Sequence, residues 1–187
     1  MMTIYIKNMV CNRCIMVVRD EFEKFGYTPV NVRLGEVETT ADISPEKMQE
    51  ISKRLQTLGF EIIDNQQSQI IEKIKTGIIQ LVHYSNEVPN INLSEYISNQ
   101  VHKDYHYLSN LFSEIEGTTI EKYIINQKIE RVKELLVYGE LTLSEIADKL
   151  GYSSVAYLSN QFKKVTGLTP SHFKQVKDQK RTPLDEV

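Results

Sequence analysis

The chain repeats one motif at an offset of fifty residues, and this repeat constrains its fold more than any other feature. Residues 104–112 (DYHYLSNLF) precede Gly117, and residues 154–162 (SVAYLSNQF) precede Gly167. Tyr, Leu, Ser, Asn, Phe and Gly recur in register between the two segments. A fixed internal period marks a supersecondary unit that is used more than once. We therefore expect two copies of one unit in the C-terminal half of the chain.

Each copy has the sequence of two short helices joined by a tight turn. Residues 92–95 (NLSE) and 142–145 (TLSE) both have the pattern of a capping box, with Glu three residues after the cap. In the second copy, small Ala147 lets two helices cross closely and Gly151 allows the turn between them. Ser153 and Ser154 can cap the next helix, which Leu158 and Phe162 anchor at positions i and i+4. The spacing predicts a helix-turn-helix unit.

The second helix of each copy leaves one face free of the predicted core. Small polar side chains on such a face can reach base edges and phosphates from the major groove of DNA. The candidate DNA-binding residues are His106, Ser109 and Asn110 in the first copy, and Ala156, Ser159, Asn160, Lys163 and Lys164 in the second. His102 fits a turn position better than a metal-ligand position, and Tyr107/Phe112 and Tyr157/Phe162 are predicted to be core pairs.

A long helix is predicted between the two copies, over residues 120–138. Its apolar positions include Tyr123, Ile129, Val132 and Leu136. At about 1.5 Å per residue this helix spans about 28 Å, whereas neighbouring major-groove faces lie about 34 Å apart. A rigid helix of this length can hold two reading units on one side of a duplex.

The overall charge does not by itself suggest a nucleic-acid partner. The chain has 22 Lys and Arg against 25 Asp and Glu, which gives a formal net charge of -3. Phosphate neutralisation by Lys and Arg supplies most non-specific affinity for DNA. A basic face must therefore come from local segregation of charge, for which the candidates are Lys163, Lys164, Lys174, Lys177, Lys180 and Arg181.

Other features of the sequence argue against several classes of protein. The longest apolar runs fall well short of the roughly 18 residues that a membrane span needs. The N-terminus lacks the pattern of a secretory signal, so we expect a cytoplasmic location and no membrane partner. Phosphate-binding glycine loops, nucleophile elbows and paired catalytic carboxylates are absent from the sequence. We therefore expect a protein that is not an enzyme.

The N-terminal part has the pattern of a small α+β domain. Strands are expected at residues 3–7, 30–34, 37–41 and 60–63, and helices at 14–25 and 45–58. This β-α-β-β-α-β order is the ferredoxin-like arrangement. The fold class is thus α+β: a ferredoxin-like domain (residues 1–65), an all-α domain with two helix-turn-helix units joined by a long helix (68–178), and a flexible tail (179–187).

Two cysteines, Cys11 and Cys14, follow the first predicted strand. As thiolates on a loop entering a helix they suit a soft ion of low coordination number such as Cu(I). The helix N-terminus and Arg13 are expected to lower their pKa values. A reversible disulfide is a second interpretation. The third is a domain kept for homodimerisation, in which the thiols are inert.

Residues 70–176 resemble the DNA-binding domain of AraC-type transcription regulators. The matching segments are residues 128–136, 142–147, 150–153, 157–164 and 166–171. The resemblance implies seven helices carrying two helix-turn-helix units, binding to operator DNA, and RNA polymerase as a partner. Ile97 stands where that family prefers Ala, and Asn110 and Asn160 replace its usual Arg or Lys. Asn favours adenine over guanine as a bidentate partner.

The N-terminal part is similar to heavy-metal-associated domains. The similarity rests on residues 9–14 (MVCNRC) and on Gly59–Phe60, with Asn8 in place of the usual Gly. Together, the two resemblances imply a DNA-binding transcription regulator that responds to a thiophilic metal ion. The alternative is a thiol redox protein or metal chaperone with a helical partner-binding domain, and the fifty-residue repeat favours the regulator.

Overall fold

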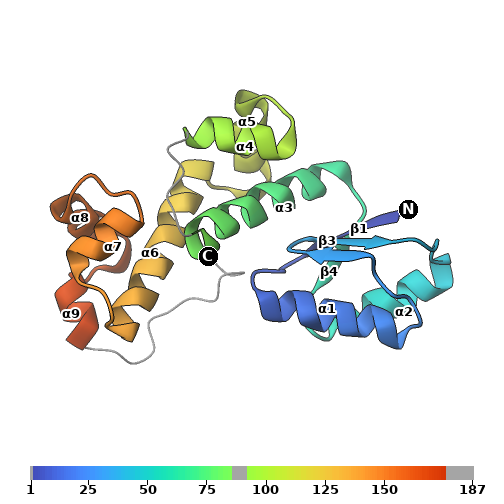
Figure 1. Ribbon diagram of the computed structural model, residues 1–187. Helices are drawn as coiled ribbons and strands as arrows, with labels where there is room; N and C mark the ends of the chain where they lie inside the picture. The colour runs from blue at the N-terminus through green and yellow to red at the C-terminus, as the bar shows by residue number, and fades with distance from the viewer. Residues whose placement is uncertain (1, 86–91, 176–187) are drawn as a thin grey trace. The chain divides into compact units, whose positions relative to one another are not determined.

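The computed structural model describes residues 2–85 and 92–175. The chain forms two compact units, residues 1–76 and residues 77–187. The first unit combines a sheet with helices, and the second is helical in its described part (Figure 1). The mixed α+β class expected from the sequence is confirmed. The domain limits at 65 and 68 stay predictions, and the tail at 179–187 lies outside the described residues.

The first unit contains the expected order of strands and helices. They are β1 (Met2–Lys7), α1 (Asn12–Lys24), β2 (Asn31–Arg33), β3 (Glu36–Thr39), α2 (Pro45–Gln56) and β4 (Glu61–Ile63). All strand pairs are antiparallel, and the sheet order is β2-β3-β1-β4. The central strand β1 alternates buried Ile4 and Ile6 with more exposed neighbours, as a strand with two different faces requires.

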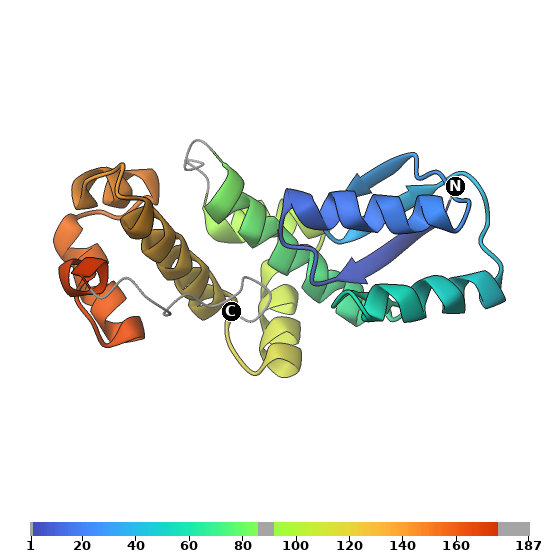
Figure 2. The same ribbon diagram turned by 90° about the horizontal axis from the view of Figure 1, so that it is seen from below.

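One face of this sheet is covered by α1 and α2, which lie side by side (Figures 1 and 2). The two helices meet through the carboxylate of Glu21, whose side chain is 5% exposed. This carboxylate accepts hydrogen bonds from Arg54 Nε at 2.9 Å and from Lys24 Nζ at 2.7 Å. These donors lower the pKa of Glu21. The ion pair therefore joins the two helices above the core, which consists of Ile4, Ile6, Val18, Phe22, Ile51 and Leu55.

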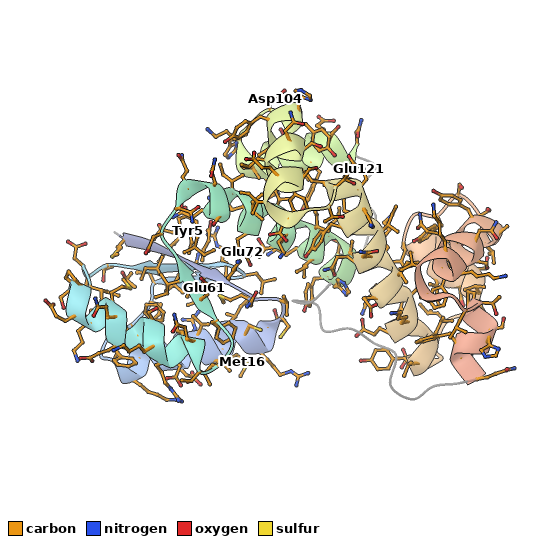
Figure 3. All side chains as sticks on the ribbon, turned by 180° about the vertical axis from the view of Figure 1, so that it is seen from behind. Tyr5, Met16, Glu61, Glu72, Asp104 and Glu121 are labelled. Atoms are coloured by element: carbon orange, nitrogen blue, oxygen red, sulfur yellow. The ribbon has the colours of Figure 1, made fainter. Side chains whose placement is uncertain are left out.

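The other face of the sheet is covered by the first part of α3 (Gln66–Ile79). Lys73 Nζ lies 3.2 Å from Glu36 and 4.9 Å from the centre of the Tyr5 ring, on the face where Glu36 and Tyr5 are paired. Tyr5 and Glu72 are labelled in Figure 3. The sequence predicts that the helical domain begins at residue 68. The helix begins earlier because Asn65 Oδ1 accepts a hydrogen bond from the backbone of Ser68 at 2.7 Å.

The second unit begins within α3, which continues as a π-helix, η1 (Gln80–Tyr84). Its other helices are α4 (Leu93–Val101), α5 (Tyr105–Glu116), α6 (Ile120–Tyr138), α7 (Leu143–Lys149), α8 (Val155–Thr166) and α9 (Pro170–Gln175). The predicted bounds of α6 are confirmed. None of the helices in the described part of the chain is both long enough and apolar enough to cross a membrane.

The long helix α6 belongs to two cores. Near its start, the Tyr123 ring packs against Phe112 of α5 at 5.6 Å. Gln127 is fully buried and joins the Tyr123 hydroxyl to His83 of η1 by hydrogen bonds of 3.0 Å each. The later part of α6 packs against α7, α8 and α9. This second core contains Ile129, Val132, Leu135, Leu136, Ile146, Ala147, Leu150, Tyr152, Leu158, Phe162 and Phe173.

The ion pair of Glu21 makes a prediction about stability and pH. Because its pKa is lowered in the folded chain, its contribution is present above the unfolded carboxyl pKa of about 4.3 and is lost as pH falls through the folded pKa. At pH 7, Glu21→Gln is expected to destabilise the chain by about 1 kcal/mol, since both cations are well solvated. The deficit should shrink below about pH 4.

Urea denaturation of the full chain at pH 7 and at pH 3.5 measures this difference. Glu23→Gln is the matched control, because Glu23 is an exposed carboxylate on the same helix. A deficit that is equal at both pH values, or equal in the two variants, would show that the ion pair adds no stability.

Candidate nucleic-acid interface

The turn of the second helix-turn-helix unit has the predicted geometry. The capping box at the start of α7 is complete: Thr142 Oγ1 accepts from the Glu145 backbone, and the Glu145 carboxylate accepts from the Thr142 backbone. Gly151 lies in the left-handed region with φ 67°. Ser154 then caps α8 by accepting a hydrogen bond from the Tyr157 backbone at 3.1 Å. The starts of both helices of the unit are thus fixed by local hydrogen bonds.

The helix α8 buries one side and exposes the other. Leu158 and Phe162 are fully buried beneath it. Of the candidate DNA-binding residues on α8, Ala156, Asn160, Lys163 and Lys164 are exposed and Ser159 is half-buried. Successive residues lie about 100° apart around a helix. By that spacing, Ala156, Asn160 and Lys164 lie along one line on the exposed side of α8.

Tyr107 and Tyr157 are not core residues, and their predicted burial is wrong. Tyr157 is 54% exposed and Tyr107 is 45% exposed, whereas Phe112 and Phe162 are buried. The reason is geometric, because residues five positions apart differ by about 140° around a helix and cannot share one buried stripe. By the same spacing, Tyr157 lies about 60° from the mean direction of Ala156, Asn160 and Lys164, and Ser159 about 100° on the other side. Tyr157 is the candidate site residue that sequence reasoning missed.

The ring of Tyr157 rests on a support that begins on α6. It packs against Tyr152 with ring centres 5.9 Å apart, and the Tyr152 hydroxyl donates to Gln161 Oε1 at 2.7 Å. Lys128 of α6 lies 5.3 Å from the centre of the Tyr152 ring, and burial lowers its pKa. A cation over an aromatic ring is attracted to its negative face. These contacts hold the exposed side of α8 in place through the long helix.

The first helix-turn-helix unit, formed by α4 and α5, reaches a similar shape by a different turn. The predicted capping box at Asn92 is not formed, because Asn92 Oδ1 accepts from the backbone and hydroxyl of Ser94 instead. The helix α4 ends at His102, which lies in the left-handed region with φ 55°. Asp104 then caps α5 and accepts from the backbones of His106 and Tyr107 at 2.9 and 3.2 Å.

The three candidate residues on α5 are brought to one side of that helix. His106 and Asn110 are exposed and Ser109 is half-buried. The Asn110 amide lies 3.4 Å from His106 Nε2. At the start of α5, the Tyr105 hydroxyl donates to the Glu121 carboxylate and so ties α5 to the start of α6. Asp104 and Glu121 are labelled in Figure 3.

The cysteine pair lies at the start of α1 in the first unit. Cys11 is the N-cap residue of that helix, and its Sγ lies 3.4 Å from Cys14 Sγ without a disulfide bond. Burial raises the pKa of Cys14, and the neighbouring Cys11 thiol adds to this. The expectation that the helix start lowers the pKa of Cys14 is therefore wrong, because desolvation outweighs the backbone hydrogen bond from Val10.

Two sulfurs at this distance can reach one metal ion after a small separation. Metal–sulfur bonds of about 2.3 Å place two sulfurs about 3.8 Å apart at a tetrahedral angle and about 4.6 Å apart when linear. The thiols would need to move apart by about 0.4–1.2 Å. Among the described residues, no group of three or more His, Cys, Asp or Glu side chains could hold a metal ion.

Comparison with known proteins shows which family the C-terminal part of the chain resembles. Residues 97–175 match the family described as "Helix-turn-helix domain". An uncharacterised transcriptional regulator of Bacillus subtilis, YtdP, is 28% identical over 106 residues, which is 57% of this chain and 14% of YtdP. The regulatory protein YesN of B. subtilis is 32% identical over 89 residues, 46% of this chain and 24% of YesN. The chain thus spans less than a quarter of the length of either relative.

A solved structure shares the fold of this part of the chain. It is the C-terminal domain of AraT, a response regulator from Geobacillus stearothermophilus, with a TM-score of 0.51 and 23% identity. The match covers 60% of this chain and 88% of that one. The two turns, the exposed faces of α5 and α8 and these matches define a helix-turn-helix DNA-binding domain. By these matches, residues 97–175 are similar to the helix-turn-helix domains of AraC-type regulators.

Substitutions at the two turn residues with left-handed backbone, His102 and Gly151, are expected to change stability in opposite directions. His102→Gly is expected to stabilise the chain by about 0.5–1 kcal/mol, because glycine removes the left-handed strain of roughly 1–2 kcal/mol and loses more freedom on folding. Gly151→Ala is expected to destabilise it by about 1 kcal/mol for the same reason. Thermal unfolding followed by circular dichroism measures both shifts. Two shifts of the same sign would contradict the turn assignment.

Proposed function

We propose that the protein is a sequence-specific transcription regulator that binds operator DNA through both helix-turn-helix units, and that it acts by binding rather than by catalysis. The observation that carries the proposal is the exposed side of α8, where Asn160 and Lys164 stand next to Tyr157 above a fixed core. Amide and amine groups on such a helix suit base edges and phosphates of the major groove. RNA polymerase is the proposed protein partner.

The side chains suggest how each group acts on DNA. Asn160 and Asn110 can each make a bidentate contact to adenine, for which an amide is the suitable partner. Lys163 and Lys164 can contact phosphates, which adds affinity without reading sequence. Tyr157 can place its ring against a thymine methyl group or donate its hydroxyl to a phosphate. This assignment predicts sites rich in A·T pairs.

For the first unit, we propose a ferredoxin-like module of the heavy-metal-associated type that binds one thiophilic ion, Cu(I), at Cys11 and Cys14. The 3.4 Å approach of the two thiols and their partial exposure support this proposal. The ion would act as effector by changing affinity for DNA. Homodimerisation through this module and a cytoplasmic location are further parts of the same proposal.

If Asn160 reads bases and Lys164 contacts phosphates, substitutions at the two positions should weaken DNA binding in different ways. Asn160→Ala is expected to lose about 1–3 kcal/mol on the specific site and to relax preference at one or two base pairs. Lys164→Ala is expected to weaken specific and random duplexes alike and to reduce the salt slope by about 0.9. Fluorescence anisotropy with the DNA upstream of the encoding gene, and with a scrambled duplex, measures both effects.

Gln56→Ala is the matched control, because it removes an exposed amide from α2 in the first unit. It should bind both duplexes as the wild type does. If Asn160→Ala keeps the full preference for the upstream DNA, Asn160 does not read bases. Equal wild-type affinity for both duplexes would contradict sequence-specific binding as a whole.

Metal response is tested by anaerobic titration of Cu(I) into the reduced full chain, with and without the specific duplex. One ion per chain is expected, with a difference in ion affinity between free and DNA-bound protein of about 5- to 150-fold. Cys11→Ser/Cys14→Ser should bind no ion and should keep the affinity of the metal-free wild type for DNA. Equal ion affinity in both states would end the effector proposal, while DNA binding would stand.

A further inference from the structure

The two repeats share a core but differ in charge. The first repeat is taken from the cap of α4 to the cap of α6, residues 92–119, and the second from the cap of α7 to Thr169, residues 142–169. The first has a formal charge of -3, from Glu95, Lys103, Asp104, Glu114 and Glu116. The second has +1, from Glu145, Asp148, Lys149, Lys163 and Lys164. Each of these side chains is at least partly exposed.

The difference is concentrated on the second helix of each repeat. The sequence of α5 has two acidic residues and no Lys or Arg, whereas that of α8 has two lysines and no acidic residue. Glu114 occupies the position that Lys164 occupies fifty residues later. Beneath them, Leu108 and Leu158 are both fully buried. The core positions are therefore kept between the repeats while the exposed charge is reversed.

The starts of the two helices differ in the same direction. The N-terminus of a helix attracts phosphate through its free N–H groups and its dipole. At α8 the cap is neutral Ser154, which leaves that attraction in place. At α5 the cap is the carboxylate of Asp104, which takes two backbone N–H groups and adds a negative charge (Figure 3). A phosphate is favoured at the start of α8 and repelled at the start of α5.

We propose that the two repeats contribute oppositely to the electrostatic affinity for DNA: the second attracts the phosphate backbone in addition to its base contact by Asn160, and the first repels the duplex unless its own base contacts offset the repulsion. This inference rests on the proposed function and deepens it. Non-specific affinity is almost entirely electrostatic, whereas base contacts act only at short range. Repulsion from α5 therefore weakens every complex, and only a matching site restores the loss through His106 and Asn110. The first repeat thus keeps the affinity for random DNA low, so that binding to a site depends on the base contacts made there.

The test reverses the charge at the equivalent positions of the two repeats. Glu114→Lys is expected to tighten binding to a random duplex about eight-fold at 0.1 M salt and to steepen the salt slope by about 0.9, the effect of one phosphate contact. Affinity for the upstream DNA should rise by a similar factor, because the repulsion acts on every complex. Lys164→Glu should weaken both complexes. Glu114→Gln should tighten random binding by a smaller factor than Glu114→Lys.

Glu140→Lys is the matched control, because it makes the same charge change at an exposed position between α6 and α7. It should leave the affinity for both duplexes unchanged. If Glu114→Lys and Glu114→Gln, both folded by circular dichroism, bind random DNA as Glu140→Lys does, the inference is overturned. A wild-type chain that binds neither duplex at 50 mM salt overturns the proposed function as well. Wild-type binding combined with unchanged Glu114 variants overturns the inference alone.

Discussion

The second unit depends on one helix that is buried on more than one side. Ten of the nineteen residues of α6 are buried, among them Gln127, Glu130 and Lys133. The helices it supports have 6 to 12 residues, lengths at which an isolated helix is marginal in water. Each helix pair therefore gains its stability from packing against α6. The polar residues on α6 remain compatible with burial because they are paired, Gln127 with Tyr123 and Glu130 with Lys133.

The packing of α8 against α6 determines which side of α8 is exposed. Leu158 and Phe162 point into the core that α8 shares with α6. The side chains on the opposite side of α8 do not contribute to that core. The side chains there can vary in chemistry at little cost to folding. Tyr152 is the link between the two sides, because it is buried against Lys128 and also supports the exposed ring of Tyr157. The contacts of the buried Tyr152 thus help to fix the position of the exposed Tyr157 ring.

Features set by local spacing could be predicted from the sequence. The bounds of α6, the turn at Gly151, the cap at Ser154 and the order of strands and helices in the first unit all follow from periodicity and capping residues, and all are observed. The burial predicted for Tyr107 and Tyr157 failed on helix geometry. Other misses arise because one residue can serve two competing interactions. Asn65 marks a linker by composition but caps α3, and Cys14 lies near a helix start but is desolvated. The spacing of residues does not tell which of two competing interactions is stronger. The roles of the candidate site residues stay predictions.

The two repeats show that their turns and their charges diverged separately. Ile97 takes the buried position of Ala147, and α4 has nine residues where α7 has seven, so the left-handed residue moves to His102. The two repeats thus differ both in this core residue and in the position of the left-handed residue of the turn. The reversal from Glu114 to Lys164 lies on the surface and alters no buried contact among those described. Under the proposed function, a net charge of -3 is compatible with DNA binding, because the electrostatic affinity would come from the lysines of one repeat and not from the net charge of the chain.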